Sequence, residues 1–151
     1  MIGAIQTSES GSPERLTVSL QDLLQDFEKI GERLGSSLPR QPNPKKELPI
    51  GNGRIARIDW LTTPIFSRPD HWLPSGGITV EDDSSKNQGI GSNLYYFGRE
   101  ISDRETQPRI IHARFDLDGN EMINRPLSVF DKDVLREVDR VLKEIDRALG
   151  S

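Results

Sequence analysis

Large apolar residues recur at helical spacing in two segments of the chain, one near each end. In residues 19–34 they return every three or four positions, which is the period of one face of an α-helix. Ser19 is suited to the N-cap of this helix and Gly35 to its C-terminal end. The same spacing predicts a second helix over residues 131–149, with Phe130 expected to anchor its start. The two apolar stripes are Leu20, Leu23, Leu24, Phe27, Ile30 and Leu34, then Val134, Val138, Val141, Leu142, Ile145 and Leu149.

Between the two helical segments, the pattern changes to the apolar–polar alternation of β-strands. The clearest case is Arg109–Asn124, which we interpret as a β-hairpin closed by Asp118-Gly119-Asn120. An Asp-Gly pair readily takes the positive φ of a tight turn. Strand-like segments precede the hairpin and are joined by turns, so the strands are expected to pair in chain order. These segments are 54–62, 78–81 and 94–101.

Together these elements predict an α+β fold. We expect a mostly antiparallel β-meander of about four to five strands, with an N-terminal and a C-terminal amphipathic helix packed on the sheet. Composition divides the chain into a flexible N-terminal tail, residues 1–15, and a single domain, residues 16–151. Within the domain the expected order is helix 19–34, Pro-rich spacer 36–49, sheet region 54–124 and C-terminal helix 131–149, with loops at 67–77 and 82–93.

Composition and charge narrow the class of protein. The chain has no cysteine, which excludes disulfides and thiolate chemistry. Because the N-terminus also lacks the features of a secretory signal, we expect a cytoplasmic protein. The net charge of −4 argues against nucleic acid as a partner. No apolar run approaches the roughly 18 residues that a membrane span needs, so no membrane association is expected.

Three chemically versatile side chains share one face of the first strand of the hairpin. His112, Arg114 and Asp116 alternate with an apolar set, so they project to one side about 6.5–7 Å apart. We expect that side to be an ordinary outer face in solvent. The alternative is a catalytic set in which His112 transfers protons and Arg114 stabilises a phosphate, aided by His71 or Asp116. The apolar set is Ile111, Ala113, Phe115 and Leu117.

A second candidate site lies in the Pro- and Gly-rich segment 67–77, which we interpret as a loop. It contains Arg68, His71 and Trp72. Because Trp and Arg are enriched at protein interfaces, these three residues are candidates for binding a partner. The simpler alternative is a tryptophan that closes the edge of the core beside a histidine that belongs only to the loop.

The sequence contains no metal-ligand spacing and no nucleotide-binding motif, so we expect neither a metal nor a cofactor. The interpretation that remains is a small protein-interaction module, regulatory or inhibitor-like, without catalytic activity. Its partner would be another protein, and formation of a homodimer through a helix or a sheet edge is compatible with it. The alternative function is a metal-independent nuclease or phosphodiesterase that uses His112 with Arg114.

Overall fold

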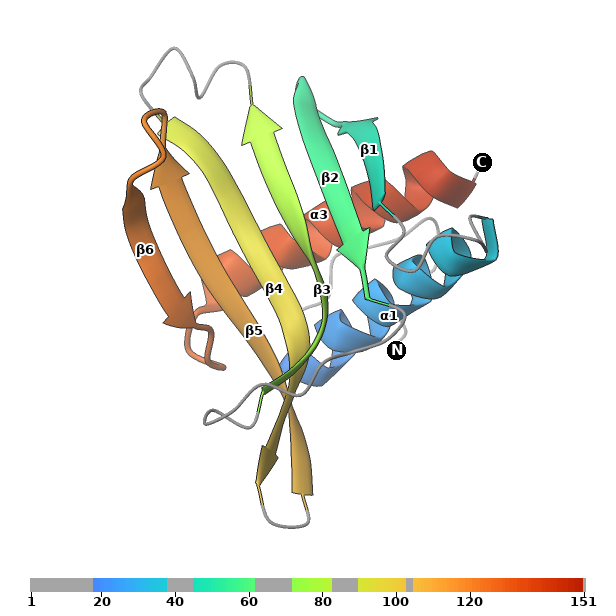
Figure 1. The fold of residues 1–151 in the computed structure, drawn as a ribbon, viewed down its shortest axis with the longest axis vertical. Helices are drawn as coiled ribbons and strands as arrows, with labels where there is room; N and C mark the ends of the chain where they lie inside the picture. Colours follow the sequence, from blue (N-terminus) through green and yellow to red (C-terminus); the bar gives the residue numbers. More distant parts are fainter. Residues whose placement is uncertain (1–17, 38–44, 62–71, 83–89, 103–104, 151) are drawn as a thin grey trace, which may run out of the picture.

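In the part of the chain that the structure describes, a single antiparallel sheet carries two helices on one side. Strands β1 to β6 pair in chain order, and α1 (Leu20–Ser37) and α3 (Lys132–Gly150) lie on the same face (Figure 1). The predicted α+β meander is therefore confirmed. The strands are β1 (Lys45–Ile50), β2 (Arg54–Trp60), β3 (Trp72–Asp82), β4 (Ile90–Ser102), β5 (Glu105–Asp116) and β6 (Glu121–Pro126). The computed structural model describes residues 18–37, 45–61, 72–82, 90–102 and 105–150.

The core lies between the helices and the sheet. Phe27 of α1 stacks on Phe97 of β4 with ring centroids 4.3 Å apart, which joins the two layers. The N-cap is confirmed, because the amide of Asp22 donates a hydrogen bond to Ser19 Oγ at 3.0 Å. We call the sheet surface toward the helices the helix face; it presents Ala56, Ile58, Ile78, Val80, Tyr95, Phe97 and Ile110, all at most 6% exposed.

The opposite surface of the sheet carries no helix in the part of the chain that the structure describes (Figure 1). We call it the open face. Its side chains alternate with those of the helix face along each strand. Across the central strands its register neighbours are Arg57, Thr79, Leu94, Tyr96, Ile111 and Ala113.

The structure differs from the sequence-based expectations at several elements of the fold. The predicted spacer contains β1, an edge strand that tolerates Pro49 because an edge position has a free side. The predicted loop 67–77 contains the start of β3, so Trp72 lies on a strand. Phe130 does not anchor α3, because its side chain is 86% exposed.

Candidate functional site

The hairpin residue His112 lies on the helix face and not in solvent. It is only 7% exposed and it pairs in register with Tyr95, whose ring is part of the core. The expectation of an outward His112 is therefore wrong. Alternation correctly separated His112 from Ile111, but it could not tell which of the two sides the helices cover. Ile110, buried on the same side as His112, marks that side as the inner one.

Two neighbours hold the His112 ring in place. Its Nε2 lies 2.9 Å from Asn93 Oδ1, and its ring stacks on Tyr95 with centroids 5.0 Å apart and planes 17° apart. Because an amide oxygen only accepts, Nε2 carries the proton and Nδ1 is left as an acceptor. Burial lowers the pKa of His112 below its ordinary value, and the positive charges of Arg125 and Arg114 lower it further. The imidazole is therefore neutral at pH 7.

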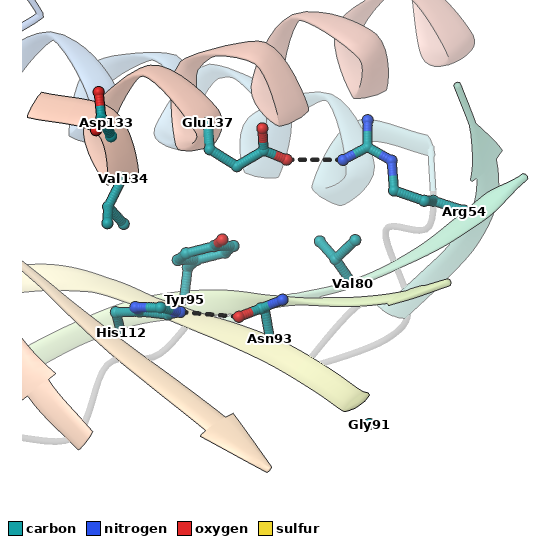
Figure 2. A pocket seen from close by; sticks show the side chains of 9 residues that line it. All are labelled: Arg54, Val80, Gly91, Asn93, Tyr95, His112, Asp133, Val134 and Glu137. Carbon is teal, nitrogen blue, oxygen red and sulfur yellow. Dashed lines mark hydrogen bonds and ion pairs between the residues drawn. The ribbon is translucent and has the colours of Figure 1, made fainter. Parts of the chain in front are cut away.

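His112 and Tyr95 form part of a cavity of about 370 Å³ between the sheet and the first turns of α3 (Figure 2). Val80 and Asn93 continue its floor on β3 and β4, and Val134 faces them from the helix. Burial, reinforced by the negative charge of Glu137, raises the pKa of the Tyr95 hydroxyl to about 12. The phenol is therefore a neutral hydrogen-bonding group at physiological pH.

The charged groups at one end of this cavity are already paired. Arg54, whose side chain is 11% exposed, binds Glu137 at 2.7 Å and Glu144 at 2.6 Å, both on α3. Glu137 also accepts from Arg140 at 2.8 Å. These four charges cancel, and their geometry clamps α3 onto the β1–β2 hairpin. Arg54 is therefore a structural residue of the cavity wall.

Arg114 shares the helix face with His112 but has a different environment. Its Nε is buried and has no hydrogen-bond partner among the described residues. Asp116 does not assist it, because its carboxylate accepts from the amides of Asp118 at 2.9 Å and Asn120 at 2.8 Å. These turn hydrogen bonds, led by that of Asn120, lower the pKa of Asp116. The three predicted residues thus share a face, but Asp116 holds the hairpin turn and does not orient His112.

Trp72 lies on the open face, and so it does not close the edge of the core between helices and sheet. Its ring covers Gly98 of β4: a Cβ added at Gly98 would lie 2.7 Å from Trp72 Cη2. The guanidinium of Arg109 stands 5.7 Å from the Trp72 ring centroid and 3.5 Å from the carboxylate of Glu100. Cation–π contact and the neighbouring strand therefore hold the indole flat on the sheet.

Beside Trp72 the open face has a groove of about 470 Å³. Its floor contains Gly77, which has no side chain to fill it, and Tyr96 is 40% exposed beside it. Burial raises the pKa of Tyr96, and the negative charges of Asp59 and Glu121 raise it further. The apolar walls are Leu61, Trp72, Pro74 and Leu94.

Of the predicted partner-binding residues, only Trp72 can be placed. Arg68, His71 and the predicted tail 1–15 lie outside the described residues. Sequence reasoning missed Asn93, which binds His112. It did not place Tyr96, which lines the groove, among the partner-binding residues. Strand alternation places Tyr95 and Tyr96 on opposite faces, so the helix face and the open face each receive one tyrosine. The alternation alone does not predict which of the two tyrosines belongs to the core and which to a binding surface.

Neither described helix is long and apolar enough to cross a membrane. In the described ranges, no cluster of three or more His, Asp or Glu side chains has the arrangement of a metal site. Comparisons with protein families, with curated proteins and with solved structures found no match for the chain. Its function therefore has to be argued from the geometry of the cavity and of the groove.

Proposed function

We propose that the protein is a non-catalytic interaction module whose open face binds a segment of a partner protein rich in apolar and basic residues. The observation that carries this proposal is the groove beside Trp72 and Tyr96, which lies on a sheet face without a helix in the described chain. Exposed aromatic side chains around an apolar depression are typical of the anchor pockets of protein interfaces.

The shape of the groove supports a protein segment as its occupant. Trp72 and Tyr96 project from paired strands, so their backbone positions are fixed before a partner arrives. Arg109 restrains the indole further through the cation–π contact. Binding then costs little side-chain ordering, which is the main advantage of a preformed aromatic anchor site.

The charges around the groove favour a basic partner. Tyr96 lies in the negative field of Asp59 and Glu121. On the open face, acidic residues outnumber basic ones, and Arg57 is already shared between two of them, Glu47 at 3.0 Å and Glu81 at 3.3 Å. Complementary charge speeds association and selects against acidic partners, including nucleic acid. The open-face carboxylates are Glu47, Asp59, Glu81, Glu100 and Glu121, against the cations Lys45, Arg57 and Arg109.

The test uses short synthetic peptides with one Leu or Phe anchor, flanked by Lys and Arg, by Asp and Glu, or by Ser and Gly. Binding to the full chain is followed by fluorescence anisotropy and by amide shifts in two-dimensional NMR spectra. We expect the basic peptides to bind at least about tenfold more tightly than the acidic ones, with shifts at Gly77 and Tyr96. Preference for acidic peptides, or for a single-stranded RNA probe, would contradict the proposal.

Paired variants locate the binding surface. Trp72→Ala and Tyr96→Ala should each weaken peptide binding by about tenfold or more, the usual effect of truncating an aromatic anchor. Met122→Ala is the matched control, because Met122 is an exposed large hydrophobic residue on β6 and not part of the groove. If the control weakens binding as much as Trp72→Ala does, the open-face groove is not the site.

A further inference from the structure

We propose that the protein forms a two-fold symmetric dimer in which Phe130 of each copy enters the cavity beside α3 of the other copy. The partner at this surface is a second copy of the chain. The surface is separate from the open-face groove, because the cavity lies on the helix face. The inference goes beyond the proposed interaction function and does not depend on it.

Phe130 is a large apolar side chain that its own copy leaves in solvent. It is 86% exposed, and Val129 beside it is 59% exposed. The backbone around them is nevertheless fixed. The amide of Phe130 donates a hydrogen bond to Ser128 Oγ at 3.2 Å, and the amide of Ser128 donates one to Asp131 Oδ2 at 2.7 Å. A ring presented on such a turn loses little conformational entropy when it binds.

The cavity has the size and the lining that a phenyl ring needs. Tyr95 and His112 stack as its floor, and Val80 and Val134 add apolar walls (Figure 2). An apolar cavity of roughly 150 Å³ is enough to hold a benzene molecule. The volume here is about 370 Å³, so a phenylalanine side chain fits. Because aromatic rings attract one another, the floor offers a phenyl group more than apolar burial alone.

The positions of the ring and the cavity favour a second copy as the partner. Phe130 comes three residues before Asp133 and four before Val134, and both of these line the cavity. The projecting ring and the cavity are therefore neighbours at the start of α3. In a two-fold symmetric dimer one surface patch meets itself. A patch that contains both a ring and a cavity thus makes the same contact twice, once in each direction.

The charges on the two sides of this contact are complementary. The four paired charges at one end of the cavity cancel, so the carboxylate of Asp133 decides the sign of the lining. Asp133 is fully exposed, and its ion pair with Arg136 is long, at 3.9 Å. Beside the projecting ring, Asp131 is paired with Arg125 at 2.8 Å, which leaves the exposed Lys132. A positive segment therefore approaches a negative rim, which favours this orientation.

The experiment measures self-association of the full chain and then locates it. One ring per copy is a small contact, so we expect sedimentation equilibrium to show a weak dimer with a Kd of about 100 µM. Isotope-filtered NMR on mixed labelled and unlabelled copies should give intermolecular NOEs from the Phe130 ring to the methyl groups of Val80 and Val134. A chain that stays monomeric up to about 1 mM would overturn the proposal. Intermolecular NOEs that omit Phe130 would do the same.

Substitutions test the ring and the cavity separately. Phe130→Ala changes an exposed side chain and should weaken association by about a hundredfold or more, because both contacts are lost at once. Val134→Phe fills the cavity from α3 and should weaken association as strongly. Asp133→Lys repels Lys132 and should weaken it less; its exposed position makes it the test of the cavity if Val134→Phe does not fold. The control is Leu117→Ala, which removes another exposed large hydrophobic residue.

The outcomes of the two proposals are distinguishable. Loss of association in Phe130→Ala with unchanged peptide binding supports the dimer by itself, whereas failure of every peptide to bind, with association intact, contradicts only the open-face proposal. Full association in Val134→Phe and Asp133→Lys would place the ring elsewhere and overturn the cavity contact. A folded Phe130→Ala variant that associates as tightly as the parent would also overturn it. If Trp72→Ala alone abolished association, the two copies would meet through the open face instead.

Discussion

The two tryptophans of the chain lie on opposite faces of one sheet, and each covers a glycine. Trp60 packs on the helix face, with its ring against Gly31 of α1 and 5.8 Å from the ring of Phe27. Trp72 packs on the open face, over Gly98 of the neighbouring strand. The local arrangement is the same, but only Trp60 has a helix above it among the described elements. The described helices therefore cover only one of the two tryptophans.

The largest effect should come from removing the aromatic ring of the helix face. Trp60→Ala leaves a void between α1 and β2 that the packed helix cannot refill. We expect the free energy of unfolding to fall by about 3 kcal/mol, since deletion of a large core side chain adds a cavity cost to the lost burial. Urea denaturation followed by circular dichroism measures it. A loss as small as that of Trp72→Ala would mean that the two faces do not differ.

The second effect concerns the glycine beneath Trp60. Helix propensity alone predicts that Gly31→Ala gains about 1 kcal/mol, because glycine is unfavourable inside a helix. The structure predicts the opposite sign: a Cβ at Gly31 would overlap the six-membered ring of Trp60. We expect a loss of about 1–3 kcal/mol, the usual cost of overpacking.

A double variant tests the cause of that loss. In the Trp60→Ala background the obstructing ring is gone, so adding Gly31→Ala should no longer destabilise the protein and should recover part of the helix propensity. The two substitutions are then strongly coupled, as expected for residues in direct contact. If Gly31→Ala costs the same in both backgrounds, the overlap with Trp60 is not its cause.

These residues also indicate how far sequence reasoning reaches. The 3–4 spacing of Leu23, Phe27 and Ile30 is a strong signal because it repeats over several turns, and all three are buried as predicted. The Asp-Gly turn was also predicted correctly, because its signal depends only on two adjacent residues. Gly119 has the positive φ expected there, at 85°. Signals that depend only on neighbours in the chain therefore identified the helices, the hairpin and the fold class.

What the sequence could not provide depends on packing between distant segments. β1 was missed because Lys45, Lys46 and Pro49 resemble a linker, and only pairing with β2 makes them a strand. The alternation around His112 left open which side of β5 the C-terminal helix would cover. The cavity combines residues of β2, β3, β4, β5 and α3, so no local pattern could reveal it.

The buried His112 should make stability depend on pH. Its pKa is lowered in the folded protein, mainly by burial, so the unfolded chain takes up a proton first as the pH falls. Stability should therefore be full above the ordinary histidine pKa of about 6.5 and should decrease as the pH drops through it. We expect a total decrease of about 1.4 kcal/mol for each pH unit by which folding lowers the pKa.

Substitution isolates the contribution of His112. His112→Gln keeps a side chain that can hydrogen-bond to Asn93 but does not titrate. The free energy of unfolding of this variant should therefore be nearly constant from about pH 7.5 to about pH 5.5, the range around the histidine pKa. His71→Gln is the control for the other histidine of the chain. The lowered pKa values of Asp116 and Asp131 act at lower pH, where their stabilisation is lost as the carboxylates protonate. An unchanged pH profile in His112→Gln would contradict this assignment.

The smallest change in stability should come from Trp72→Ala, and this result would sharpen the comparison most. Trp72 covers Gly98 but supports no helix in the described chain, so its removal should lower the free energy of unfolding by less than about 1 kcal/mol. The same substitution should cost the open face most of its affinity for a basic peptide. Stability and binding would then respond to different tryptophans. If Trp72→Ala instead lowered the free energy of unfolding nearly as much as Trp60→Ala does, Trp72 would be a fold-stabilising residue. The open face would then lose its main support as a binding surface.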